Sequence, residues 1–139
     1  EFYAKKGKKL KHQIKKNRFY MPRLDTKTHG YIDWTWSSKE IVDFISAFGK
    51  PHEGAKTYIE NKKIFLTSEC KRYSSFLIPH PFQYGIVYRK DNKFIYVLVK
   101  DGSIKIKLDF SLSANVRLGS RFYTPIKYLD RAMLYKATF

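Results

Sequence analysis

Four histidines are the first residues whose types could support catalysis or metal binding: His12, His29, His52 and His80. No two of them are four apart, the spacing at which a helix presents a pair to a metal ion, and no cysteine pair accompanies them. The single cysteine, Cys70, cannot close a disulfide within the chain. A small packed residue near the end of a strand is a better interpretation of Cys70 than a nucleophile. These residue types therefore do not indicate a metal or thiol site.

The carboxylates and glycines do not form a catalytic pattern either. Asp33, Glu40 and Asp43 are typical of a turn, a helix cap and a solvated helix face. The seven glycines are scattered and form no phosphate-binding loop. No Ser-His-Asp constellation is apparent, so the residues favour a binding or supporting module.

Aromatic and basic residues near the amino terminus are better candidates for ligand contact. Tyr20 and Arg23 end a stretch that interleaves cations with rings, and Trp34 and Trp36 follow shortly. Cations bind phosphates, while rings stack on bases or sugars. Two tryptophans two residues apart in an extended segment point the same way, so core packing outweighs ligand contact for both of them. For Arg23 the two interpretations are balanced.

The charge of the chain indicates an anionic partner. Lysine and arginine number 28 against 12 aspartates and glutamates, which gives a formal net charge of +16. A field of this sign attracts nucleic acid, nucleotide sugars or acidic lipid. The alternative is that lysine is simply the common surface residue of this chain.

Composition favours one compact domain with a core, because 43% of the 139 residues are hydrophobic. No apolar run approaches the ~18–20 residues of a membrane span, and no secretory signal is visible. With a single cysteine, these features predict a cytoplasmic protein with no membrane partner. The sequence begins at Glu1 without a methionine, which favours a fragment of a longer chain.

The clearest predicted element is a helix over residues 38–48. Ser37 can cap it with Glu40 three residues on, and Gly49 follows where a left-handed cap is wanted. A second helix is predicted over 125–136, with Thr124 as its cap and Pro125 at its first position. The first helix carries one apolar stripe (Ile41, Phe44, Ile45, Phe48), and the second has a predicted buried side (Leu129, Ala132, Met133).

Between the helices the hydrophobic period changes to two, which predicts short strands. The last of them, 104–110, places Ile104, Ile106, Leu108 and Phe110 on one face. The fold class is therefore α+β and mostly β, a small antiparallel barrel or an open sheet. One helix precedes the strands and one lies at the C-terminus. The predicted strands are 57–59, 63–68, 85–89, 94–99 and 104–110.

Several runs together are similar to the stretch of formyltransferases that leads from the catalytic domain into the C-terminal domain. They are Pro22-Arg23-Leu24, Ile32-Asp33-Trp34, the helix ending Ala47-Phe48, and Pro51 followed by Gly54-Ala55-Lys56-Thr57. Two later runs resemble the amino-sugar branch of this family more than the methionyl-tRNA branch. These are His80-Pro81-Phe82-Gln83-Tyr84-Gly85 and Gly119-Ser120-Arg121-Phe122-Tyr123-Thr124-Pro125.

The resemblance implies that the barrel is of the oligonucleotide-binding (OB-like) type. It also implies a division of labour within a longer enzyme. The family's catalytic domain carries an Asn-His-Asp set and uses 10-formyltetrahydrofolate, and it precedes the connector. Residues 1–36 are thus expected to be a basic arm and connector from a missing N-terminal catalytic domain, and 37–139 the C-terminal domain. No catalytic residue is expected here, because His80, although followed by proline, lies downstream of the connector. No cofactor is expected in this chain.

Three hypotheses follow. The leading one is the non-catalytic C-terminal part of an amino-sugar N-formyltransferase, with Tyr20, Arg23, Trp34 and Trp36 as substrate-binding residues and a nucleotide sugar as substrate. The second is a tRNA-binding C-terminal domain of methionyl-tRNA formyltransferase, motivated by the charge and the predicted barrel. The third is a structural or dimerising module that forms a homodimer.

Overall fold

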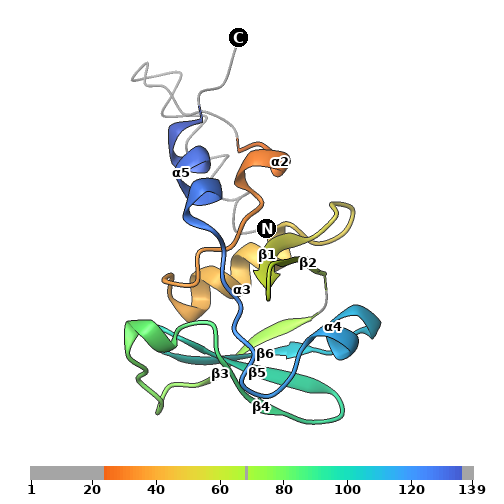
Figure 1. Cartoon of the computed structure of the whole chain (residues 1–139), viewed down its shortest axis with the longest axis vertical. Helices are drawn as coiled ribbons and strands as arrows, with labels where there is room; N and C mark the ends of the chain where they lie inside the picture. The colour runs from red at the N-terminus through yellow and green to blue at the C-terminus, as the bar shows by residue number, and fades with distance from the viewer. Residues whose placement is uncertain (1–23, 68, 136–139) are drawn as a thin grey trace, which may run out of the picture.

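The computed structural model describes residues 24–67 and 69–135 of the chain (Figure 1). Two short helices and one longer helix accompany two antiparallel sheets, and a final helix ends the described part. In chain order the elements are α2 Thr26–His29, α3 Ser38–Ala47, β1 Ala55–Ile59, β2 Lys62–Leu66, β3 Cys70–Ser74, the 3-10 helix η1 Pro81–Gln83, β4 Val87–Lys90, β5 Phe94–Val99, β6 Gly102–Lys107, α4 Phe110–Asn115 and α5 Ile126–Leu134.

Both sheets are open. One is the β1–β2 hairpin, and the other has four strands in the order β3-β6-β5-β4. The described residues form no closed barrel, because β3 and β4 remain unpaired edges of the larger sheet. The α+β class, the open-sheet alternative and the helices before the strands and at the C-terminus are confirmed. The barrel alternative is not.

Helix α3 begins where its capping residues predict. The Ser37 side chain accepts from the Glu40 backbone N–H, and the Glu40 carboxylate accepts from the Ser37 backbone in return. Its apolar stripe is buried and packs on β3 and β6, which fixes the helix over one face of the larger sheet. The predicted left-handed cap at Gly49 is wrong. The helix ends at Ala47, and its C-cap residue Phe48 has φ −94° and donates its N–H to the Phe44 carbonyl, while Gly49 is not among the glycines with positive φ.

The strand predictions fail where a local signal ends the strand. β5 has the predicted bounds, but β6 ends at Lys107, because Asp109 accepts from the Leu112 N–H and caps α4. Phe110 is therefore 91% exposed instead of facing the core. β3 was not predicted. Its burial does not alternate along the strand, because its three middle residues are all exposed.

Residues 121–123, which we call the bridging segment, connect the two sheets. Tyr123 forms an isolated bridge with Tyr58 of β1, and Arg121 forms one with Ile86, just before β4. Between them, Phe122 is fully buried, and its backbone N–H donates to the Gly85 carbonyl. Gly85 has φ +89°, and a Cβ there would lie 2.1 Å from the Phe122 carbonyl oxygen, so only glycine fits.

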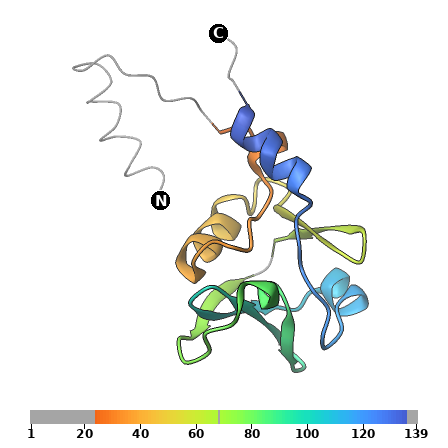
Figure 2. The ribbon, with the colours of Figure 1, turned by 60° about the vertical axis from the view of Figure 1, so that its left-hand side comes forward.

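Helix α5 lies beside α2 at one end of the molecule, away from the four-stranded sheet (Figure 2). Pro125 precedes it without a side-chain cap, because the Thr124 hydroxyl donates instead to the Ile32 carbonyl. The predicted buried side is wrong for Met133, which is 85% exposed, whereas Leu129 and Ala132 are half-buried. Among the described residues, no helix has the length and apolar character needed to cross a membrane.

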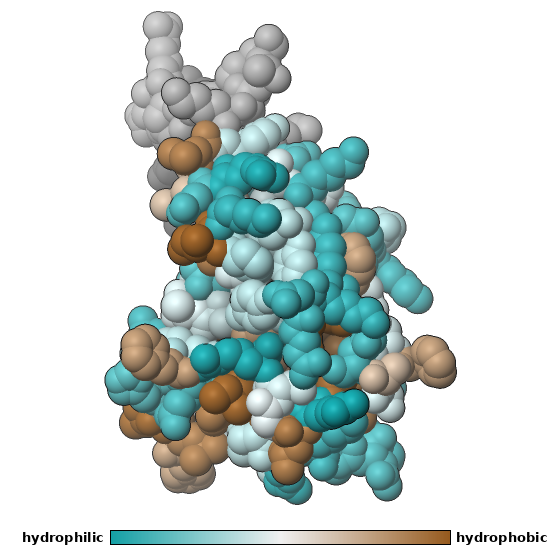
Figure 3. Space-filling view, viewed as in Figure 1, coloured by the Kyte–Doolittle hydropathy of each residue, from teal (hydrophilic) through white to brown (hydrophobic). Residues whose placement is uncertain are grey.

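Hydrophilic residues cover the face shown in Figure 3 around the β1–β2 hairpin, and hydrophobic patches lie below them, toward the four-stranded sheet. The buried core lies between α3, the inner face of that sheet and the hairpin. The connector before α3 runs along this core, and it is this packing that positions the candidate site.

Candidate functional site

The connector is held to β1 by backbone hydrogen bonds. The Ile32 N–H donates to the Lys56 carbonyl at 2.9 Å, and the Lys56 N–H donates to the Gly30 carbonyl at 2.7 Å. Tyr31 and Lys56 thereby form a parallel bridge. The chain that enters the domain is therefore fixed to the hairpin before α3 begins.

Trp34 locks this connector onto the bridging segment. Its ring is 5% exposed and stacks on Phe122, with 5.2 Å between ring centroids. Its indole Nε1 donates to the Thr57 hydroxyl at 2.8 Å, and that hydroxyl donates to the Tyr123 carbonyl at 3.1 Å. The buried indole N–H has a hydrogen-bond partner, so the role of most of the Trp34 ring is core packing.

Trp36 also packs against the core, as expected for both tryptophans, but at another place. The Asp33 carboxylate accepts from the backbone and hydroxyl of Thr35, which turns the chain at Trp34–Thr35. Trp36 is half-buried against Phe44 of α3, with ring centroids 4.9 Å apart. The other two predicted contact residues, Tyr20 and Arg23, lie outside the described residues.

A surface groove of about 310 Å³ opens along the connector beside Trp34. Three stretches line it: the connector at 33–35, η1 with the residue after it, and the chain from the bridging segment into α5. Trp34 belongs to this lining and Trp36 does not. The groove is thus built from parts far apart in sequence that the bridging segment holds together.

The groove combines aromatic surface with one acid and one cation. Phe82 is 81% exposed at its rim, and Tyr84 is half-buried. Arg121 uses its Nε to donate to the Tyr84 carbonyl at 3.2 Å, which leaves its terminal nitrogens for a ligand. Asp33 is the only carboxylate among the lining residues. Such a groove can stack a flat ring, accept an N–H and bind a phosphate.

His80 supports the groove without entering it. Its imidazole Nδ1 accepts from the Phe82 N–H at 3.1 Å, and the His80 backbone N–H donates to the Gln83 side-chain oxygen at 2.8 Å. His80 therefore caps η1 and orients Phe82. The sequence predicted neither Phe82 nor Arg121 as contact residues, although both lie inside the two runs that carried the amino-sugar resemblance.

A second surface of aromatic and basic residues covers the outer face of the four-stranded sheet. The Tyr73 and Tyr96 rings lie 4.6 Å apart, and the Arg89 guanidinium lies 4.8 Å from the Tyr96 centroid. Tyr73 is 46% exposed, whereas Tyr96 beside it is only 5% exposed. The Lys105 ammonium lies 4.7 Å from the Phe94 centroid. We call these five residues the outer sheet surface.

These elements form a mixed α+β domain, and the connector that precedes α3 builds one wall of its groove. Residues 25–111 match the family described as Formyl transferase, C-terminal domain. This is more than half of the chain, so the chain belongs to that family, as its motifs predicted. No curated protein sequence matches the chain.

Proposed function

We propose that the chain is the non-catalytic C-terminal part of an amino-sugar N-formyltransferase. The whole enzyme would transfer a formyl group from 10-formyltetrahydrofolate to the amine of a nucleotide-linked amino sugar. The observation that carries this proposal is the groove beside Trp34, since it combines ring surface, a carboxylate and a guanidinium on the connector side of the domain. Membership of the formyltransferase family supplies the reaction class.

The chemical step itself belongs in this proposal to a separate N-terminal catalytic domain. The groove's lining residues include no histidine, and the part of the chain that the structure describes holds no cluster of three potential metal ligands. The residues at the groove do not fit the Asn-His-Asp set that the resemblance assigns to formyl transfer. We therefore derive no step of that transfer from this chain.

The groove residues have distinct roles in this proposal. Arg121 binds a phosphate of the nucleotide through its free terminal nitrogens, and Phe82 offers a face for the base or the sugar. Trp34 holds the groove wall and Trp36 anchors the connector on α3. Tyr20 and Arg23 remain proposed contacts at the edge of the cleft that this domain shares with the catalytic domain.

The test is a calorimetric titration of this chain with a thymidine-diphosphate amino sugar at two salt concentrations. Replacing Arg121→Gln should weaken binding by about tenfold, because a charge-assisted hydrogen bond contributes about 1.5–3 kcal/mol. Arg89→Gln removes the same charge on the outer sheet surface and should leave binding within about twofold. Equal losses in both variants, or no response to the nucleotide sugar, would contradict the proposed contact.

The outer sheet surface favours a second candidate function, binding of tRNA. Rings interleaved with cations on an open sheet can stack bases while they neutralise phosphates. This candidate predicts tight tRNA binding with a steep salt dependence, because each neutralised phosphate releases counterions. Lys105→Glu should then weaken tRNA binding more than Lys50→Glu, a reversal of charge beyond the end of α3. Weak tRNA binding that both variants affect equally would exclude this candidate, and a concentration-dependent mass would instead indicate a dimerising module.

A further inference from the structure

Three tyrosines stack beneath α5, on the side of the helix that carries Lys127 and Arg131. The rings of Tyr31 and Tyr128 lie 4.6 Å apart and nearly parallel, and Tyr58 stacks on Tyr128 at 5.6 Å. Tyr31 comes from the connector, Tyr58 from β1 and Tyr128 from α5. The stack therefore forms only when all three parts of the fold are in place.

A directional hydrogen bond runs through this stack and ends at Tyr128. The Tyr58 hydroxyl donates to the Tyr128 hydroxyl at 3.0 Å. Because a phenol has one hydrogen, Tyr128 keeps its own O–H as a donor, and accepting a bond makes it a stronger donor. The middle ring of the stack thus carries one polarised hydroxyl whose hydrogen Tyr58 does not use.

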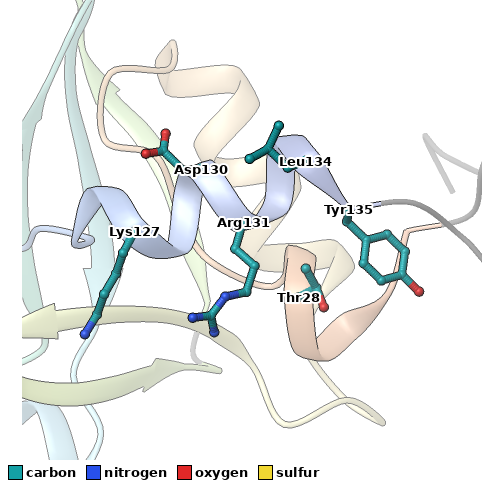
Figure 4. Close-up of a pocket in the computed structure, with 6 residues that line it drawn as sticks. All are labelled: Thr28, Lys127, Asp130, Arg131, Leu134 and Tyr135. Atoms are coloured by element: carbon teal, nitrogen blue, oxygen red, sulfur yellow. The ribbon is translucent and has the colours of Figure 1, made fainter.

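Four cations lie close to these rings. The Lys56 ammonium lies 4.7 Å from the Tyr31 centroid, but it is buried, donates to the Lys27 carbonyl and pairs with Glu53. The other three remain as candidates for binding a ligand. The Lys63 ammonium lies 5.5 Å from the Tyr31 centroid, and Lys127 and Arg131 lie 5.1 and 5.7 Å from the Tyr128 centroid. Figure 4 shows Lys127 and Arg131 extending from α5 toward the strands, and Asp130, which lines the same pocket, points away from both of them in this view.

None of these three cations is neutralised by a carboxylate. Within residues 24–67 and 69–135, none of them forms a salt bridge, and the rest of the sequence contains only one acid, Glu1. Like charges four residues apart on a helix repel by a few tenths of a kcal/mol, so an anion bound between Lys127 and Arg131 would relieve this repulsion. An arrangement of this kind becomes favourable when an anion occupies it.

The electrostatics of Tyr128 agree with this geometry. The hydrogen bond from Tyr58 lowers the pKa of Tyr128, and the charges of Lys127, Lys63 and Arg131 lower it further. The same hydrogen bond, together with burial, raises the pKa of Tyr58 to about 12. All three cations therefore act on the oxygen that ends the hydroxyl chain.

We propose that Lys63, Lys127, Arg131 and the Tyr128 hydroxyl form a binding site for a compact polyphosphate group such as a diphosphate. The three cations gather around one pair of rings instead of following a track, so they suit a compact anion better than an extended nucleic-acid backbone. This site differs from the groove, which the opposite side of α5 lines through Ile126 and Leu129. It does not depend on the proposed function.

The experiment is a titration of the whole chain with inorganic pyrophosphate, followed by calorimetry and by tyrosine fluorescence. The double variant Lys127→Gln/Arg131→Gln should weaken binding by at least about tenfold, since it removes two charge-assisted contacts. Tyr128→Phe keeps the ring and removes the donor, so a loss of about threefold to tenfold is expected. The control Lys71→Gln/Lys107→Gln removes the same charge from the four-stranded sheet and should change binding by less than about twofold.

Three outcomes would overturn the site. These are equal losses in the two double variants, undetectable pyrophosphate binding at millimolar concentration, and an oligonucleotide that depends on these residues when pyrophosphate does not. The thermal midpoint of each variant, measured without ligand, separates lost binding from lost folding. Removal of the uncompensated charges should leave that midpoint unchanged or raise it slightly.

Discussion

The thiol of Cys70 lies half-buried at the start of β3, packed against the hydrophobic core. Burial raises its pKa to about 12, because the thiolate would lose its hydration there. At pH 8 we therefore expect iodoacetamide to label the folded chain far more slowly than the chain in guanidinium chloride, as mass spectrometry would show. Rapid labelling of the folded chain would mean that the thiol opens to solvent. The packed interpretation of Cys70 follows from the same environment.

Predictions for single residues were correct where the interacting partners lie close together in the sequence. Ser37 and Glu40 cap a helix because their partners are three residues apart. Core packing of both tryptophans was predicted correctly, although the turn that Asp33 makes with Thr35 replaces the extended geometry on which that prediction rested. Arg121 was missed as a contact residue because its place in the groove depends on a bridge to Ile86, 35 positions earlier by the numbering.

Asp101 couples α3 to the four-stranded sheet. Its carboxylate, in the β5–β6 turn, accepts from the Ser38 backbone N–H at 2.7 Å and from the Ser38 hydroxyl at 3.0 Å. Burial opposes ionisation of Asp101, but these bonds and the charge of Arg72 outweigh it, and the net effect is a lowered pKa. The folded state therefore binds the proton more weakly than the unfolded state, and this stabilisation is lost as the pH falls.

We expect Asp101→Asn to lower the free energy of unfolding at pH 7 by about 1 kcal/mol, after allowance for the partial exposure of this group. The difference from the wild type should shrink below about pH 4, where the unfolded chain takes up the proton. Urea titrations at several pH values measure both effects. Asp43→Asn, a change on the exposed face of α3 that removes only a surface ion pair with Lys39, is the control. A difference that stays constant with pH would contradict the assigned role of Asp101.

Elements whose limits depend on distant partners were predicted less well than α3 and β5. β3 exists because it pairs with β6, from Cys70 opposite Ile106 to Ser74 opposite Ser103, and its own residues show little alternation. The period-two pattern from Ile104 continued into Phe110, where the cap from Asp109 begins a helix instead. Periodicity located the strands, and capping and pairing decided where they end.

For the molecule as a whole, a formal charge of +16 on 139 residues means considerable self-repulsion. Sodium chloride screens it, since the Debye length falls to about 10 Å at 0.1 M. We therefore expect the thermal midpoint to rise by a few degrees between about 0.02 and 0.2 M salt. Calorimetric scans check this, with the same osmolarity of sucrose as the control. A midpoint that falls or does not change would mean that attractive ion pairs outweigh the repulsion.

The fold class was accessible from composition and periodicity, whereas both candidate sites were not. The groove and the tyrosine stack each draw on the connector, on the hairpin or η1, and on the last part of the chain. No local spacing connects Tyr31, Tyr58 and Tyr128. Only the three-dimensional path of the chain brings their rings together.

The bridging segment at residues 121–123 also has a consequence for synthesis of the protein. It completes the connection between the two sheets, yet it lies beyond residue 111, where the family match ends. During translation the hairpin and the larger sheet leave the ribosome before the bridging segment. Trp34 and Gly85 therefore lack their contacts with Phe122 until that segment has been synthesised. A chain truncated at residue 111, the end of the family match, would never form these contacts. The folded domain must therefore include Phe122, which fills the space between the two sheets.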